Sequence, residues 1–405
     1  MRIHTVAEGD TVFNIGRKYA IPPSKIIEHN GLTEPDRLIK GQKLAIFTPT
    51  RTYTVRGGDS LENIAIRFET DIDSLLAANP SLSGQNRCYP GQILSIKFDA
   101  PEFGTGISNG IYYEGCSKDR FLGAIPYLSY LTVSAARWEG GALRRKFKTS
   151  ELTSFANEKG KIPLLRIFAP EDEKIFFEHS EELINNLPDY LLKESFGGVC
   201  LAAFSAARNQ KKYAEFLLEL KRQLMDYDLL LFVELDGNSD SLPTPELSSV
   251  PDGISLNYEK CHLEEIPSFK EAEAAFMTDY AENLAPEKTL IDLPSFAYSE
   301  NCEIPRRDAE ILARKKGEHI LYDKDAMVSY FSYNKYSFGK KTRTKVVFPS
   351  LENICERMKL TGKLGYMGIS FDIMRVPTEF LMMFHTMFRG NGMNLNVPKT
   401  SCRGE

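Results

Sequence analysis

The chain has 405 residues, with 50 Lys or Arg and 55 Asp or Glu, which gives a formal net charge of −5 at neutral pH. This charge disfavours nonspecific nucleic-acid binding, and no segment dense in Lys and Arg contradicts it. No apolar run reaches the roughly 18 residues of a membrane span, and no apolar signal segment precedes the first motif. We expect no nucleic-acid partner, no membrane span and no signal peptide, and therefore synthesis in the cytoplasm.

One pattern occurs twice at the N-terminus, because residues 4–47 recur at 53–98 with a nearly constant offset. Each copy is too short for a large core, but its apolar residues are periodic. Their spacing predicts the order strand, helix, helix, strand in both copies. We assign residues 1–48 to the first module and residues 51–98 to the second module.

Polar residues mark the ends of the predicted helices. Asp10-Thr11 and Asp59-Ser60 can cap the first helix of each copy. Asn30 and Asn79 stand where the second helix should stop, since Asn tolerates the left-handed conformation. Taken singly, Gly-Asp and Asn are equally well explained as turn and cap residues without a binding role.

The motif YTV-x-x-GD-[ST]-x-x-NI-x-x-[RK]-[YF], the helix-ending Asn and PGQ-x-L-x-I together resemble the LysM module. In the first copy Lys40 stands where the second has Pro90, which weakens the turn. The resemblance implies binding of N-acetylglucosamine-containing glycans, such as peptidoglycan or chitin, in a shallow groove between two loops. The implied loop residues are Gly9, Asp10, Thr11, Val12, Asn30, Gly31 and Leu32 in the first module, and Gly58, Asp59, Ser60, Leu61, Asn79, Pro80, Ser81 and Leu82 in the second. Two weak sites on one short tether, residues 48–52, would gain effective concentration on a single glycan strand.

The seven cysteines are odd in number, scattered and never in a CxxC pair, which is typical of free thiols. The six histidines form no cluster of the kind that builds a metal site. We therefore expect no metal and no cofactor.

From about residue 99 onward, apolar strand-like runs alternate with longer helical patterns, which predicts a parallel sheet. The eight predicted strands are 106–113, 131–138, 162–169, 198–204, 229–236, 253–259, 289–296 and 365–372. A length of about 290 residues is usual for a single eight-fold barrel. The predicted fold class is therefore α/β, a (β/α)8 TIM barrel over residues 99–390, followed by a flexible polar tail at 391–405.

Between the seventh and eighth strands, at about 299–347, the pattern predicts a small α+β insertion. Its predicted helix is 308–316, and its strands are 319–322, 329–333 and 344–348. This insertion, the phrase at 290–296 and the ending at 365–370 resemble glycoside hydrolase family 18, the chitinase-like barrels. The order LysM, LysM, barrel resembles the cortex-fragment-lytic subgroup of spore-forming bacteria. That resemblance implies association with the spore coat, the cortex or the cell wall, and a spore-envelope protein as a partner.

In that family the fourth strand carries Asp-x-x-Asp-x-Asp-x-Glu, whose Glu protonates the glycosidic oxygen. Here Gly197, Cys200, Ala202 and Phe204 occupy those positions, and no carboxylate follows until Glu215. Hydrolysis by the substrate-assisted route needs a proton donor and an orienting carboxylate. Loss of a positioned acid costs roughly two to four orders of magnitude in rate, so we expect no catalysis by the standard route.

Side chains at other strand ends could still form a pocket at the carboxyl face of the barrel. Aromatic rings suit sugar faces and carboxylates suit sugar hydroxyls, which selects Tyr112, Tyr113, Glu114 and Tyr258. If the barrel is an enzyme with a rewired acid, the proton donor would be Glu259, Asp236 or Asp372. In the alternative without a pocket, Phe204 fills the vacated centre and these groups are solvated loop residues.

The sequence thus supports two functions from different classes. The first is a protein that binds peptidoglycan or another N-acetylglucosamine glycan through its LysM pair and carries a catalytically degenerate barrel. The second is an active N-acetylglucosaminidase or chitinase-like, cortex-lytic hydrolase with a non-standard acid. A structural protein of the spore envelope overlaps the first interpretation.

Overall fold

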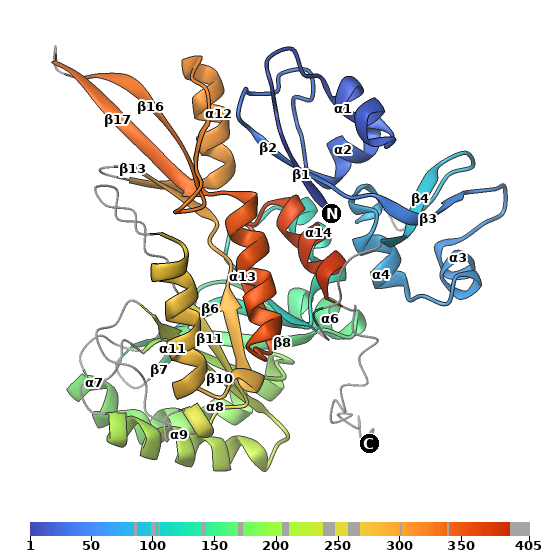
Figure 1. Cartoon of the computed structure of the whole chain (residues 1–405). Coiled ribbons are helices and arrows are strands. Elements are labelled where there is room, and N and C mark those ends of the chain that lie inside the picture. The colour runs from blue at the N-terminus through green and yellow to red at the C-terminus, as the bar shows by residue number, and fades with distance from the viewer. Residues whose placement is uncertain are drawn as a thin grey trace.

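The computed structural model describes residues 1–84, 87–98, 103, 106–139, 142–168, 173–204, 210–237, 248–257, 268–299, 302–337 and 340–388. The predicted tail at 391–405 and the candidates Tyr258 and Glu259 lie outside these residues. Among the helices described, none combines the length and the apolar character needed to cross a membrane. Figure 1 shows two small N-terminal modules, in blue, beside a larger body from which an orange hairpin extends.

Each N-terminal module is an antiparallel strand pair with two short helices. The first module consists of β1 Arg2–Thr5, α1 Val12–Tyr19, α2 Pro23–His29 and β2 Lys43–Ile46. The second consists of β3 Pro49–Thr54, α3 Leu61–Arg67, α4 Ile72–Ala77, the 3-10 helix η1 Pro80–Leu82 and β4 Ile93–Phe98. The predicted order is confirmed, but the supposed tether at 48–52 lies largely within β3.

The predicted starts of the first helices are confirmed by their capping bonds. Thr11 Oγ1 accepts a hydrogen bond from the Asn14 backbone N–H at 3.1 Å, and Ser60 Oγ accepts one from Asn63 at 3.1 Å. Each bond satisfies a backbone donor that the first helical turn leaves without a partner, which contributes about 1 kcal/mol.

The expectation that Asn30 and Asn79 end their helices in the left-handed conformation is wrong, because their φ angles are −103° and −139°. Each buried side-chain amide instead joins the end of the second helix to the returning strand. Asn79 donates to the carbonyl oxygens of Leu75 and Ser95 at 2.9 and 2.8 Å and accepts from the Ser95 N–H at 2.8 Å. Asn30 makes the equivalent three bonds in the first module. An amide that both donates and accepts can do this without a positive φ.

Eight parallel strands form the barrel: β5 Ile107–Tyr112, β6 Tyr130–Glu139, β8 Ile162–Phe168, β9 Gly198–Phe204, β10 Leu230–Asp236, β11 Gly253–Asn257, β12 Thr289–Asp292 and β18 Gly368–Asp372. The sheet is closed because β5 pairs with both β18 and β6. A further strand, β7 Ala142–Arg145, lies antiparallel on β6. All eight predicted strands are present, which confirms the predicted fold class. The seventh ends at Asp292, short of the predicted residue 296, since Pro294 cannot donate a ladder hydrogen bond.

The helices cover the outer face of the barrel. They are α5 Lys118–Ala124 with the 3-10 turn η2 Ile125–Tyr127, α6 Ser150–Glu158, α7 Glu173–Glu178, α8 Ser180–Lys193, α9 Gln210–Met225, η3 Lys270–Ala274 with α11 Ala275–Asn283, the 3-10 turn η4 Pro286–Lys288, α13 Leu351–Lys363 and α14 Thr378–Met387. Outward residues of the strands, such as Leu131, Leu201 and Val233, are fully buried beneath them. The helix predicted at 211–227 corresponds to α9.

The interior of the barrel changes from apolar to polar along the strands. Near the strand starts, an apolar interior layer is formed by Tyr130, Leu164, Cys200, Phe232 and Leu290. Two residues further along the same strands, the inward positions carry Thr132, Arg166, Ala202, Glu234 and Asp292. The polar layer therefore lies toward the carboxyl ends of the strands, where TIM barrels place their sites.

The insertion is a five-stranded sheet with one helix. It contains β13 Phe296–Ser299, β14 Cys302–Pro305, α12 Arg306–Lys316, β15 Leu321–Asp323, β16 Val328–Ser337 and β17 Lys340–Pro349, in the spatial order β14-β13-β17-β16-β15. The predicted helix and strands are present, although the strands predicted at 329–333 and 344–348 extend over Val328–Ser337 and Lys340–Pro349. The β16–β17 hairpin forms the extension seen in Figure 1.

The two modules pack against the barrel and its insertion. Tyr127 Oη donates a hydrogen bond to the Ala77 carbonyl oxygen at 2.7 Å, and Lys161 forms an ion pair with Asp73 at 2.5 Å. On the other side, Gly41 has a φ of +88°, and a Cβ there would lie 1.7 Å from the Ile320 carbonyl oxygen. Only glycine allows this approach. The modules are therefore held in place and do not move freely on a tether.

Candidate functional site

The first loop of each module is a turn in which the aspartate is already engaged. Gly9 and Gly58 have φ angles of +82° and +86°. Asp10 Oδ2 accepts bonds from the Ala7 N–H at 2.8 Å and from His4 at 2.9 Å, and the Ala7 bond is the main cause that lowers the pKa of Asp10. Asp59 is held in the same way by the Tyr53 hydroxyl at 2.6 Å, which lowers its pKa. These carboxylates therefore shape the turns.

The second loop of the first module faces the insertion and α14. Arg307 donates a hydrogen bond to the Gly31 carbonyl oxygen, and a Cβ at Gly31 would lie 2.9 Å from Thr378 Oγ1. Glu34, further along the same loop, pairs with Arg314 of α12 at 2.6 Å. A cavity of only about 50 Å³ remains between this loop and α12. Half of the predicted groove in the first module is therefore covered by the barrel insertion.

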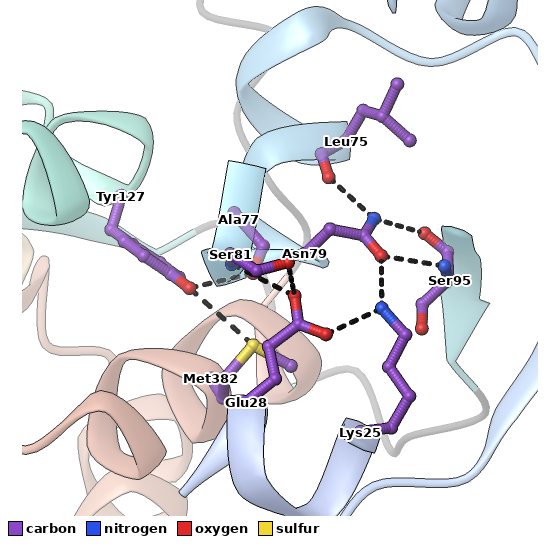
Figure 2. Close-up of polar contacts among 9 residues, drawn as sticks. All are labelled: Lys25, Glu28, Leu75, Ala77, Asn79, Ser81, Ser95, Tyr127 and Met382. Atoms are coloured by element: carbon purple, nitrogen blue, oxygen red, sulfur yellow. Dashed lines mark hydrogen bonds and ion pairs between the residues drawn. The ribbon is translucent and has the colours of Figure 1, made fainter. Parts of the chain in front are cut away.

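The second loop of the second module contacts the first module (Figure 2). Ser81 donates its backbone N–H and its hydroxyl to Glu28 Oε1 at 3.0 and 2.7 Å. Lys25 Nζ donates to Glu28 Oε2 at 2.7 Å and to Asn79 Oδ1 at 2.9 Å. Burial acts to raise the pKa of Glu28, but Lys25 and Ser81 together outweigh burial and hold that pKa below its ordinary value. Ser81 is thus committed to a contact between the modules.

An ion pair occupies the interior of the barrel near the carboxyl ends of the strands. Arg166 of β8 donates to both carboxylate oxygens of Glu234 of β10, at 2.8 and 2.5 Å, and also to the Tyr113 hydroxyl at 3.1 Å. Burial acts to lower the pKa of Arg166, but Glu234 outweighs it and raises that pKa. Such a two-point pairing is among the stronger hydrogen-bonded contacts in proteins.

Beside this pair lies a cavity of about 80 Å³. Its polar lining includes Tyr113, Arg166, Glu234, Asn257, Asp292 and Asp372. Burial raises the pKa of Asp372, partly opposed by Arg375 at 2.7 Å, and burial raises the pKa of Tyr113 to about 12. Among the described residues, Asn257 Oδ1 is buried without a hydrogen-bond donor. The cavity is small, polar and able to hold a few sugar atoms at most.

Only some of the barrel residues that the sequence suggested lie at this cavity. Tyr113 and Asp372 line the cavity. Tyr112 points outward, with ring-centroid distances of 5.6 Å to Phe121 and 6.2 Å to Phe147. Glu114 and Asp236 are exposed, and neither lines the cavity. On β9, Cys200 and Ala202 are buried and Gly197 precedes the strand, while the Phe204 side chain lies outside what the structure describes.

Arg166 and Glu234 are not among the residues that the sequence suggested. A signal was present, because Arg166 is the lone charged residue of β8, and Glu234 is a charged residue within the apolar run of β10. Each also follows an interior apolar residue, Leu164 or Phe232, by two positions. Period-two alternation places such residues on the same interior face, so a charge there requires a partner across the barrel.

Comparison with a protein-family model decides the nature of the N-terminal modules. Residues 4–47 and 53–97 match the model of the LysM domain. Both modules are LysM domains. The chain is similar to the cell wall-binding protein YocH of Bacillus subtilis, with 37% identity over 109 residues. That match covers 26% of this chain and 37% of YocH, and the chain covers half or less of two further curated relatives.

Solved structures show which fold accompanies the LysM domains. The spore cortex-lytic enzyme SleL of Bacillus megaterium superimposes with a TM-score of 0.74 at 18% identity, over 96% of this chain and 99% of that one. A chitinase of Chromobacterium violaceum superimposes with a TM-score of 0.61 at 15% identity, over 70% of this chain and 99% of that one. The fold expected from the resemblance to the chitinase-like barrels is confirmed.

Proposed function

We propose that the chain binds peptidoglycan or a related N-acetylglucosamine glycan through its LysM domains, in association with the cell wall or the spore. The observation that carries this proposal is the match of both modules to the LysM model. The names of two similar proteins support it, since one is described as cell wall-binding and the other as a spore cortex-lytic enzyme. A spore-envelope protein partner is a further part of this proposal.

The barrel, in our proposal, does not hydrolyse glycans by the standard route of the chitinase-like family. Its fourth strand, β9, carries Cys200 and Ala202 where the family resemblance expects aspartates. An interior carboxylate on the neighbouring strand β10, Glu234, has both oxygens bonded to Arg166. A carboxylate engaged in this way is not presented to a glycosidic oxygen. Both observations support a barrel without the usual acid.

Sedimentation with insoluble peptidoglycan tests the binding proposal. The full chain should pellet with the wall material, and soluble N-acetylglucosamine oligomers should release it. A matched incubation with an insoluble glycan that lacks acetamido groups, such as cellulose, controls for nonspecific adsorption. A chain that stays in the supernatant with peptidoglycan contradicts the proposal.

The alternative function is a glycoside hydrolase with a rewired acid, and Asp372 is the observation that favours it. This carboxyl lines the barrel cavity together with Tyr113, and burial raises its pKa, as a proton donor requires. Asp236 is exposed and Glu259 lies outside the described residues. Mass spectrometry of peptidoglycan fragments and N-acetylglucosamine oligomers after long incubation tests it. Cleavage that disappears in Asp372→Asn but persists in Asp236→Asn would show that the barrel is a hydrolase with Asp372 as its acid.

A further inference from the structure

A groove runs between the second module and the barrel. Its volume is about 440 Å³, several times the cavity at the equivalent loop of the first module. Small-molecule sites typically measure about 300 to 1,000 Å³ and are mostly apolar with a few polar groups. This groove is therefore large enough for a short stretch of a ligand. It lies beside the second LysM domain, and its lining residues indicate which kind of ligand it suits.

The module wall of the groove includes one residue of the first loop that the LysM resemblance assigns to glycan binding, and a residue just past the second loop. Leu61 belongs to the first loop, and Gly84 lies two residues beyond Leu82 at the end of the second. Glu62 and Ile72 continue this wall along the helices and are exposed. In the first module, the second loop instead contacts Arg307 of α12. The two LysM domains therefore differ in the surface to which their loops open.

The barrel wall of the groove combines apolar and cationic side chains. Leu122 and Phe155 are half-buried, and they project from α5 and α6. Lys118 is exposed at the start of α5, and Lys159 Nζ lies 5.4 Å from the centre of the Phe155 ring. Apolar and aromatic surfaces suit the faces and acetamido methyl groups of amino sugars, and the ammonium groups can donate to hydroxyl and carbonyl oxygens.

The charges of the two walls favour a neutral ligand. Lys118 and Lys159 lie on the barrel wall, while Glu62 and Asp73, the latter paired with Lys161, lie on the module wall. A strongly anionic or cationic chain would meet an unfavourable charge on one side, whereas N-acetylglucosamine oligomers carry no net charge. The groove is also held at a fixed width, because the nearby ion pair between Lys161 and Asp73 joins its two walls.

We propose that a neutral N-acetylglucosamine glycan bound by the second module lies in this groove, with α5 and α6 of the barrel as its second wall. This inference rests on the proposed glycan-binding function and adds the barrel to the binding surface. The main role of the first module is then structural, because it contacts both the second module and the insertion. The bound glycan contacts the outer surface of the barrel and not its interior cavity.

Calorimetric titration of the full chain with N-acetylglucosamine hexamer tests this arrangement. Leu122→Asp should weaken binding about tenfold, the scale expected for a central apolar contact. Lys118→Glu should weaken it several-fold without harming the helix, since an acidic residue is favourable in a first helical turn. Lys341→Glu on the β16–β17 hairpin makes the same charge change far from the groove and should bind like the wild type. Thermal unfolding of every variant checks that the fold is retained.

A tryptophan reporter gives a second measurement that does not depend on weakened binding. The one native tryptophan, Trp138, is buried. In Leu122→Trp, the fluorescence emission maximum of the new tryptophan should shift on addition of the hexamer. In Leu218→Trp, at an exposed position of α9, the emission maximum should not change. Absence of binding by the wild type, to the hexamer and to peptidoglycan, would remove the proposed function itself. Wild-type binding that both groove variants retain in full would overturn only the composite groove.

Discussion

Lys25 of the first LysM domain donates a hydrogen bond to the side chain of Asn79 in the second, at 2.9 Å, and both residues are buried (Figure 2). Asn79 is the residue that fixes the end of α4 against β4. The contact between the domains therefore involves a residue that holds a helix and a strand of the second domain together. The two domains are expected to behave as one unit in unfolding.

Lys25→Met should destabilise the chain by about 3 kcal/mol, because Glu28 would lose its cation while remaining largely buried. Urea unfolding measures the change. Lys18→Met, at an exposed lysine of α1, provides the control and should change the free energy of unfolding by less than about 0.5 kcal/mol. Equal stability of the two variants would show that the contact between the domains contributes little.

Gly41→Ala should separate the first module from the insertion. The new Cβ would lie 1.7 Å from the Ile320 carbonyl oxygen, so the backbones must move apart. Gly91 occupies the equivalent turn of the second module with φ +87° and has nothing within 4 Å of its Cβ position. Gly91→Ala therefore carries the same cost of a left-handed alanine, about 1 to 2 kcal/mol, without the clash. Limited proteolysis should cut Gly41→Ala faster, and equal cutting of both variants would refute the docking contact.

Arg166→Met should destabilise the barrel by about 3 to 5 kcal/mol, because it leaves the Glu234 carboxylate without its guanidinium partner. The double variant Arg166→Met with Glu234→Leu removes both charges and should recover most of that loss. Denaturant unfolding of the two single variants and the double variant completes the cycle. A double variant as unstable as Arg166→Met would mean that the cost comes from lost packing and not from the unpaired charge.

Acid should weaken the joint between the two LysM domains through His29. Burial is the main cause that lowers the pKa of His29 from 6.5 to about 4. The ring packs edge-on against Phe47 and Phe98, at centroid distances of 5.6 and 5.9 Å. Because the folded state disfavours the proton, the stability that His29 contributes is complete above pH 6.5. It is lost as the pH falls from 6.5 to about 4, up to about 3 kcal/mol.

The matched variant for this pH dependence is His29→Gln, which stays neutral over the whole range. Urea unfolding at pH 7, 6, 5 and 4 should show a steeper loss for the wild type than for the variant between pH 6.5 and 4. Identical slopes would assign the acid sensitivity to carboxylates, such as Glu28, whose pKa is also lowered.

Short-range patterns predicted most of this fold, and long-range contacts account for what they missed. Period-two and period-3.6 spacing located the eight barrel strands and α9, and capping chemistry located Thr11 and Ser60. The backbone of Asn79 was predicted wrongly because its partner Ser95 lies on another element. The pairing of Arg166 with Glu234 joins residues far apart in sequence, and alternation indicates their common face but not their contact. The assignment of glycan binding to two loops of each module stays a prediction, and which of these loops is covered depends on how the domains dock.

The two LysM repeats are joined head to tail. Helix α2 of the first repeat contacts the loop after α4 of the second, and α4, the equivalent helix, contacts Tyr127 and Lys161 of the barrel. The residues that make the first contact, Lys25 and Glu28, have become Ser74 and Ala77 in the second repeat. A head-to-tail contact does not close on itself, so such repeats could in principle stack further. Here the barrel takes the place of the next repeat and terminates the stack on that side.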